Sequence, residues 1–348
     1  MSFRSTQLAN RFGHTRLIVG AGALVVLLAV IHVGVGSRWF TPIQVLDALL
    51  RRSGDPALEF IVHDLRVPRT LIGVVAGALL GVSGVLIQAA LGNPLASPEI
   101  TGATGGSVLA VVVWLQFAPT AAATGSAVLL GLVAFAGGVT AAVVVTVVAA
   151  RSGSTLALLL CGVLVSGLLS AVTSLLLLRR STTLGGSLTW LVGSLNGRTW
   201  SQWQSLWPAA LLAAVVATVL VPLANVMSLG EATARSLGLG PQRARLALFG
   251  GGVLASSSAV MVVGGVAFVG LMAPHIAFRL VGADHRVRLP LAALVGAVIV
   301  TAADIGSQLL TLHPIIGNAE QRAGIPVGAA TAIVGAPLFL IIARRGRR

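Results

Sequence analysis

Long apolar runs alternate with short polar segments along the whole chain. Each run has about the 20 mostly apolar residues that an α-helix needs to cross the hydrocarbon core of a bilayer. The polar segments between the runs are too short to form a separate soluble domain. The pattern predicts an all-α membrane protein with about ten transmembrane helices, at residues 17–36, 68–90, 100–117, 124–149, 155–178, 206–226, 245–264, 266–283, 289–308 and 325–343.

The flanking charges predict the orientation of these helices. An even number of spans places both ends of the chain on one side of the membrane, and basic residues favour the cytoplasmic side. Arginines precede the first run, and the chain closes on the basic segment ARRGRR. We therefore expect both termini in the cytoplasm. The first run is too long for a signal peptide and ends at no clear cleavage site, so we expect it to be retained as a span.

The composition agrees with a lipid-embedded chain. Hydrophobic residues make up 56% of the sequence and charged residues only 9%, whereas soluble domains carry about 25% charged residues. The net charge is +14, and all 23 basic residues are arginine. Because topology signals in membrane proteins are rich in arginine, this charge does not indicate nucleic-acid binding. The single cysteine, Cys161, excludes an internal disulfide bond and a multi-cysteine metal site.

The chain carries few groups for catalysis or ion coupling. The ionisable candidates within the predicted spans are Asp304, His275 and His32, and such a histidine is more often a hydrogen-bonded structural group than a proton relay. The sequence has no HExxH motif and no P-loop GxxxxGK[ST]. We expect neither enzymatic activity nor a cofactor or metal bound by this chain. If the protein moves a solute uphill, the energy comes from another subunit.

Two arginines, Arg66 and Arg69, precede the second span in the stretch VHDLRVPRTLIGVV. The predicted orientation places them outside, where the positive-inside rule thins out basic residues. One interpretation is structural: Asp64, Asp55 and Glu59 neutralise them locally, or they reach lipid phosphates. The other is a docking site for an acidic partner, since the planar guanidinium binds carboxylates through two parallel hydrogen bonds. The spacing alone does not separate these interpretations.

A cytoplasmic connection at residues 91–106, LGNPLASPEITGATGG, contains strong turn signals. Asn93-Pro94 and Ser97-Pro98 predict a rigid return between two spans, because proline restricts the backbone and removes a hydrogen-bond donor. The segment is either a plain tight turn or a gate element at the inner end of a pathway.

A second cytoplasmic connection, at residues 227–250, is longer and polar. Glu231 and Arg235 are four residues apart on a predicted short helix that stops at Gly238, and Gly240-Pro241 separates it from the next helix. Such a helix is either an ordinary amphipathic surface helix or the contact for a peripheral subunit.

Taken together, these segments resemble the FecCD-type permease subunits of ABC importers for iron–siderophore complexes, haem and vitamin B12. The resemblance covers nearly the whole chain and is strongest over residues 64–106 and 228–343. The motifs that carry it are DLRVPRTLIGVVAGALLGVSGVLIQAALGNPLASPEITGATGG, EATARSLGLG, GGVAFVGLMAPHIAFRLVGADHRVRLPLAALVGAVIVTAADI and IPVGAATAIVGAPLFLI.

The resemblance implies one transmembrane permease domain over residues 1–348, with cytoplasmic coupling helices at about 228–244. Such a subunit dimerises and has its pathway between the two subunits, and a paralogue is the expected partner rather than a second copy. Two ATPase subunits, which bind ATP and Mg²⁺, and an extracytoplasmic solute-binding protein complete the implied complex. Its expected location is the cytoplasmic membrane, in contact with lipid.

The resemblance also implies roles for residues that match the family motifs. Arg66 and Arg69 are implied to dock the binding protein. The implied coupling and gate residues are Glu231, Ala232, Arg235, Ser236, Leu237 and Gly238 for the ATPase contact, and Asn93, Pro94, Leu95, Ser154 and Thr155 for the gate.

The chain departs from the family pattern near the ninth and tenth spans. Gln308 stands where many members carry an arginine, and Gly324 where they carry a glutamate. Arg322 or Glu320, in a longer connecting segment, are candidates to supply the missing charge, and Arg322 joins the predicted docking residues.

The segment SLTWLVGSLNGRTW, residues 187–200, resembles the short pathway-lining helix of siderophore permeases. A ferric siderophore is therefore the expected cargo, and haem and cobalamin are the alternatives within the family. A stand-alone secondary transporter is the alternative of another class. The scarcity of ionisable groups within the spans and the polar segment 227–250 disfavour it.

Overall fold

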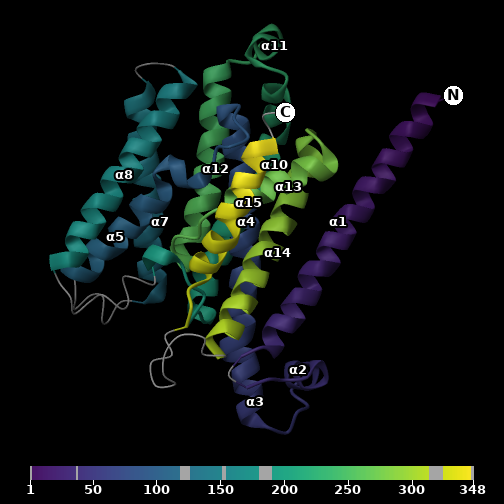
Figure 1. Ribbon diagram of the computed structural model, residues 1–348, viewed down its shortest axis with the longest axis vertical. Coiled ribbons are helices and arrows are strands. Elements are labelled where there is room, and N and C mark those ends of the chain that lie inside the picture. The colour runs from purple at the N-terminus through teal and green to yellow at the C-terminus, as the bar shows by residue number, and fades with distance from the viewer. Residues whose placement is uncertain are drawn as a thin grey trace.

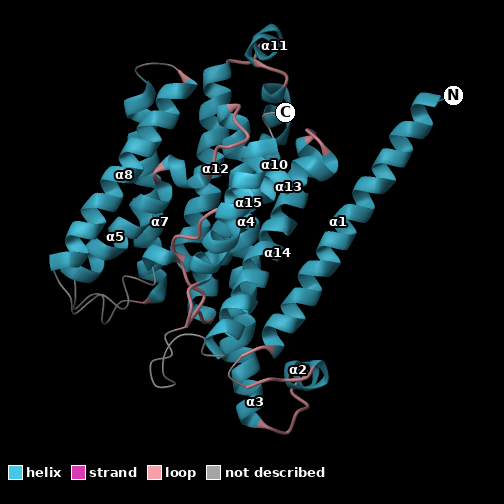
Figure 2. Cartoon of the chain, viewed as in Figure 1, coloured by secondary structure: helices cyan, strands magenta, loops and turns pink. Residues whose placement is uncertain are grey.

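The computed structural model describes residues 2–36, 38–117, 126–150, 154–179, 190–312 and 324–345, and the regular secondary structure of these residues is helical (Figure 2). Each of the ten predicted spans corresponds to a helix: α1 (Ser2–Gly34), α4 (Val67–Leu91), α5 (Ala103–Phe117), α7 (Ala127–Ala150), α8 (Thr155–Arg179), α10 (Trp200–Ser228), α12 (Pro241–Val263), α13 (Val269–Val281), α14 (His285–Leu312) and α15 (Val327–Arg345). Seven of them are long and apolar enough to cross a membrane, whereas α5, α13 and the apolar part of α15 are shorter. The prediction of an all-α membrane protein is confirmed.

Several helix starts differ from the prediction, and at three of them local signals outweigh the onset of apolar residues. Helix α10 begins at Trp200 rather than 206, since Thr199 and Gln202 form a capping box. Helix α12 begins at Pro241 rather than 245, because proline suits the first turn of a helix. The third span begins at Ala103 rather than 100, after the short 3₁₀ helix η2 (Pro98–Thr101) and Gly102 at φ 81°.

Helix α4 runs through the centre of the bundle, where it contacts α12, α13 and α14 (Figure 1). The close approach of α4 to α13 and α14 depends on glycine residues. A Cβ added at Gly77 or Gly84 would overlap with the carbonyl oxygen of Gly296 or Gly270, respectively. Small residues at such spacing let helix backbones touch, which is a common means of packing helices in membranes. Helix α4 is therefore a buried central helix, with Arg66 and Arg69 at its start and Asn93 just after its end.

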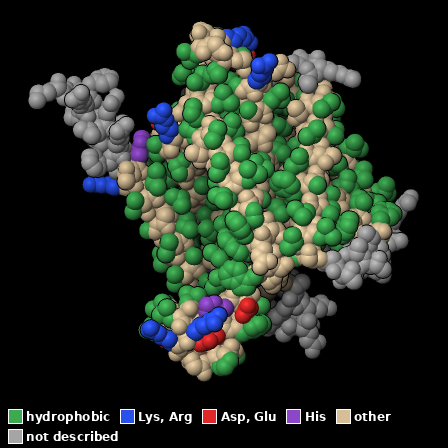
Figure 3. All heavy atoms as spheres, turned by 180° about the vertical axis from the view of Figure 1, so that it is seen from behind, with side chains coloured by type: hydrophobic (Ala, Val, Ile, Leu, Met, Phe, Trp, Pro, Cys, Tyr) green, Lys and Arg blue, Asp and Glu red, His purple; other side chains and the backbone are tan. Residues whose placement is uncertain are grey.

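The two ends of the bundle differ in structure. The short helix α11 (Glu231–Ser236) lies at the end where the chain begins and finishes, as an even number of spans requires (Figure 1). The helices α2 (Pro42–Leu49) and α3 (Pro56–Phe60) lie at the opposite end, and the π-helix η1 (Ile61–Arg66) joins α3 to α4. Charged side chains gather towards the ends, and hydrophobic side chains cover the middle (Figure 3). The end with α2 and α3 is called the outer end below, and the end with α11 the inner end.

Candidate functional site

Arg66 and Arg69 flank the junction at which η1 becomes α4, at the outer end. The Arg66 guanidinium is buried and turns towards α1, where Nη1 donates to the carbonyl oxygens of Val33 at 2.7 Å and Gly34 at 2.9 Å. Its Nη2 donates to the Arg38 carbonyl oxygen, and the group lies 4.4 Å from the centre of the Phe40 ring. Arg66 therefore holds the connection between α1 and α2.

Two of the nearby acidic side chains, Asp55 and Glu59, form no ion pair with Arg66 or Arg69 among the described residues. The Asp55 carboxylate caps α3 by accepting from the Ala57 and Leu58 amides at 3.0 and 3.2 Å. The Glu59 carboxylate accepts from the Ser53 hydroxyl at 2.9 Å. Both acids satisfy local donors, which are closer along the chain than either arginine.

Arg69 instead pairs with Asp304 of α14. Its Nε and Nη2 donate to the two carboxylate oxygens at 2.8 and 2.9 Å. The Asp304 side chain is only 1% exposed, and the Arg69 side chain is 18% exposed. The second Nη of Arg69 has no hydrogen bond to the described residues, and Arg69 lines a cavity at this end. The ion pair thus fixes one edge of the guanidinium and leaves the other edge available.

His32 of α1 joins this pair through both ring nitrogens. Nε2 lies 2.6 Å from the Asp304 carboxylate and Nδ1 lies 2.6 Å from the Thr70 hydroxyl. The Thr70 hydroxyl donates its proton to the Arg66 carbonyl oxygen at 2.8 Å, so it accepts from His32. Asp304 therefore contacts both the Arg69 guanidinium and the His32 ring.

Gln308 completes this cluster, which comprises His32, Arg69, Thr70, Asp304 and Gln308. Its amide nitrogen donates to the Asp304 carboxylate at 3.2 Å, one helical turn along α14. This chain has a neutral amide at this position, and the His32 ring contacts the same carboxylate. Arg322 and Glu320, the candidates to supply the missing charge, lie outside the described residues.

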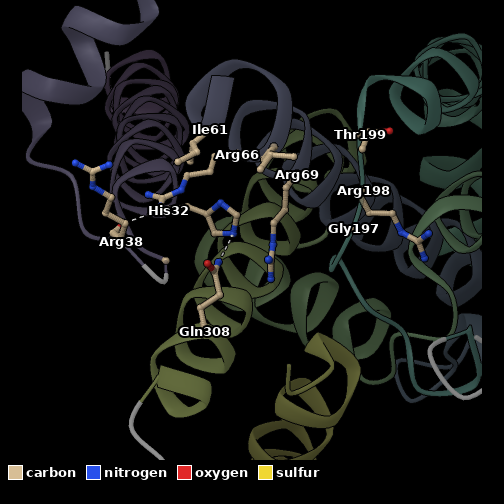
Figure 4. Close-up of a pocket in the computed structure, with 11 residues that line it drawn as sticks. His32, Arg38, Ile61, Arg66, Arg69, Gly197, Arg198, Thr199 and Gln308 are labelled. Carbon is tan, nitrogen blue, oxygen red and sulfur yellow. Dashed lines mark hydrogen bonds between the residues drawn. The ribbon is translucent and has the colours of Figure 1, made fainter. Parts of the chain in front are cut away.

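A cavity of about 450 Å³ opens beside the cluster. His32, Arg69 and Gln308 converge on it from α1, α4 and α14, and Arg198 lies on its opposite side (Figure 4). Arg38 and Arg66 also line it, and none of its described lining residues is acidic. We call this cavity the outer arginine pocket. Its chemistry suits a carboxylate or another anion.

Arg198 is partly buried and still protonated at neutral pH. Its guanidinium lies 5.3 Å from the centre of the Trp190 ring, and its Nε donates to the Ser194 carbonyl oxygen at 3.3 Å. Burial lowers the pKa of Arg198 to about 10, so the side chain is protonated at neutral pH. The segment that carries Arg198 is only partly helical. Residues 190–192 are helical, and residues 193–199 form an irregular loop with Gly193 at φ 79°. Residues 187–189 lie outside the described part.

At the inner end, α11 has the form predicted from its charges and glycines. Glu231 pairs with Arg235 at 3.1 Å and with Arg245 of α12, and Gly238 at φ 78° follows the helix. The pair with Arg245, whose side chain is 11% exposed, joins α11 to α12. The six residues predicted to contact an ATPase are all exposed: Glu231, Ala232, Arg235, Ser236, Leu237 and Gly238.

The two predicted gate turns also lie towards the inner end. After α4, Asn93 accepts from the Leu95 amide at 2.9 Å, and Pro94 lies between them. Ser154 caps α8 by accepting from the Ala157 amide at 3.1 Å, and the Thr155 side chain lies outside the described part. A small cleft brings Ser154 beside Gln242 and Arg245. The structure thus joins the Ser154 turn to the α11–α12 segment, and Asn93 does not line that cleft.

These observations define a class of protein: a helical integral protein of the cytoplasmic membrane with a basic cavity at one end and an exposed short helix at the other. A family model described as the FecCD transport family matches residues 24–345. The chain belongs to this family, and it is an ABC importer permease.

Relatives of known name span several cargoes. The chain is 33% identical to the Fe(3+)-citrate import system permease protein YfmE of Bacillus subtilis, over 92% of each chain. It is 37% identical to the achromobactin transport system permease protein CbrC of Dickeya dadantii, over 92% of this chain and 89% of that protein. The cobalamin import system permease protein BtuC of Halobacterium salinarum is 33% identical over 95% of this chain and 86% of its own length.

A solved structure shares the fold. It shows an inward-facing conformation of a protein assigned to the metal-chelate type of ABC transporters, with a TM-score of 0.79 and 30% sequence identity. The match covers 95% of this chain and 99% of that chain. The two chains therefore share the fold over nearly their whole length.

Proposed function

We propose that this chain is the membrane-embedded permease for a ferric siderophore. The observation that carries the proposal is the placement of the outer arginine pocket and the exposed α11 at opposite ends of one bundle, as delivery from outside and ATP-driven motion from inside require. Iron-chelate names among the relatives support this cargo over cobalamin. A relative named for cobalamin import keeps that cargo as the second candidate.

The proposed machinery divides between this chain and its partners. The chain acts as one transmembrane domain without enzymatic activity or a cofactor of its own, beside a paralogous second permease. Two ATPases bind ATP and Mg²⁺ and contact residues 228–244. The Asn93–Leu95 and Ser154–Thr155 turns act as the inner gate, and alternating access moves the cargo between the subunits.

A solute-binding protein is proposed to dock on the outer arginine pocket with a carboxylate. Arg69 meets it with the guanidinium edge that Asp304 leaves available, and Arg66 contributes by holding the α1–α2 connection in place. Arg322 remains a proposed third docking residue. Since the Arg66 donors already serve carbonyl oxygens of this chain, Arg69 is the residue of the pair that can form the direct contact.

Transport in reconstituted vesicles tests the proposed function. The chain would be incorporated into proteoliposomes with its partner permease, ATPases and binding protein, and uptake of labelled ferric siderophore, haem and cobalamin would be measured. We expect ferric siderophore uptake that requires both ATP and the binding protein. Uptake by this chain alone along an ion gradient would instead identify a secondary transporter, and selective cobalamin uptake would reassign the cargo.

Replacing Arg69 with glutamine is expected to weaken binding-protein docking by about 2 kcal/mol or more, roughly 30-fold in Kd, because a charge-assisted hydrogen-bonded contact is lost. Arg52→Gln is the matched control: Arg52 is exposed at the outer end but does not line the pocket. Its Kd should stay within about twofold of the parent value. Surface plasmon resonance on the complex in nanodiscs measures both, and equal Kd values for the two variants would contradict direct docking by Arg69.

A further inference from the structure

An apolar groove of about 570 Å³ lies between α7, α10 and α12. Its walls include Phe135 and Val143 of α7, Leu212 of α10, and Leu246 and Phe249 of α12. The one hydroxyl in the lining, that of Thr146, donates to the Ala142 carbonyl oxygen at 2.8 Å and leaves no unpaired polar group there. Along α12 the groove reaches from Leu246 to Leu254, about 12 Å at 1.5 Å per residue, in the inner half of the bundle.

The inner end of this groove is basic. Arg243 precedes Leu246 by three residues and Gly250 by seven, so all three lie on the same exposed face of α12. Arg243 is exposed, and no ion pair joins it to another described residue. It also lines a surface cavity of about 460 Å³ together with Arg235, Arg245 and Glu231. Three arginines and one carboxylate leave this cavity with a net positive charge.

The basic cavity and the apolar groove adjoin. The small cleft beside Ser154 contains Arg245, which also lines the basic cavity, and Leu246, which also lines the groove. A ligand that fills both must therefore be amphipathic, with an anionic head next to an apolar chain of about the groove's length. A wholly apolar occupant would fill the groove but would leave Arg243 without an anionic partner.

We propose that this surface binds one anionic phospholipid of the inner leaflet. One acyl chain lies in the groove along α12, and the phosphate lies against Arg243, which is at the membrane end of the 228–244 segment proposed above to contact the ATPases. Basic pockets beside transmembrane helices on the cytoplasmic side recognise anionic headgroups in this way. Because the lipid contacts α7, α10 and α12 next to α11, it would stabilise the connection between α11 and α12.

Gly250 provides a sharp test. A Cβ built at Gly250 meets no protein atom within 4 Å, although the residue lines the groove. Gly250→Leu should therefore fold and place its side chain where the acyl chain lies. Gly20→Leu is the matched control, because Gly20 is exposed on α1, also has open space at its Cβ, and does not line the groove.

The measurement is native mass spectrometry of the full chain released from nanodiscs of phosphatidylglycerol mixed with phosphatidylcholine. We expect one retained phosphatidylglycerol on the parent and on Gly20→Leu, and about tenfold less retention on Gly250→Leu and on Arg243→Gln. Equal retention of the two lipids by the parent, or unchanged retention by both groove variants, would overturn the proposal. Loss of self-association by Gly250→Leu without a change in lipid retention would identify the groove as a protein interface and overturn it as well.

Discussion

Replacing Gly84 with leucine is expected to leave almost no folded permease. The Cβ at this position would overlap with the carbonyl oxygen of Gly270 and crowd the Pro274 ring of α13. Overpacked cores usually lose about 1–3 kcal/mol, and the loss here should be at or above that range because the main obstacle is backbone rather than a side chain that can rotate. The yield of monodisperse protein in detergent measures the effect.

Gly20→Leu serves as the control for this substitution too, since its Cβ meets nothing within 4 Å and the residue faces outwards. Its yield should match that of the parent. If Gly84→Leu were purified in similar amounts with an unchanged unfolding temperature, the close contact between α4 and α13 would not be required for the fold.

Replacing Asp304 with alanine is expected to lower the free energy of unfolding by about 3–5 kcal/mol. The substitution leaves the Arg69 guanidinium and the His32 ring without their shared carboxylate, and a buried charge that has lost its partner is costly. Asp304 is also the point where α1, α4 and α14 meet, through His32, Arg69 and Gln308. Thermal unfolding in detergent micelles measures the loss.

A double-mutant cycle separates the charge from the general effect of truncation. Adding Arg69→Gln to Asp304→Ala removes one unpaired cation, so the double variant should be less destabilised than the sum of the two single variants. Asp47→Ala is the control, because Asp47 lies on α2 and forms no ion pair with the described residues. Its effect should stay within about 0.5 kcal/mol. Strict additivity of Asp304→Ala and Arg69→Gln would show that the pair is not coupled.

The order and approximate position of the helices follow from the sequence. Apolar run length reports on bilayer thickness, which is the same constraint for every span. The short helix at Glu231–Ser236 is equally local, since a charge pair four residues apart and the glycine that follows define it. Capping at Thr199 was the local signal that outweighed the apolar pattern at the start of α10.

The partners of the outer arginines could not be read from the sequence. Asp55 and Glu59 are close to Arg66 and Arg69 along the chain, yet the carboxylate that pairs with Arg69 is 235 residues away, and its histidine partner is 272 residues from it. The one sequence signal was that His32 and Asp304 are rare ionisable groups near the outer ends of their spans. Intramembrane ionisable groups usually pair with one another, which the depth of both residues could have indicated.

A bundle of about ten apolar helices, with a polar inner segment and an arginine pair at the other end, can be predicted from local patterns, because length, periodicity and capping act over a few residues. Three features required the folded chain: Arg66 turns inwards, Arg69 shares Asp304 with His32, and an apolar groove begins one helical turn from Arg243. These features depend on which helix faces touch. Such contacts are set by glycine-mediated packing of backbones across the whole bundle rather than by any local pattern.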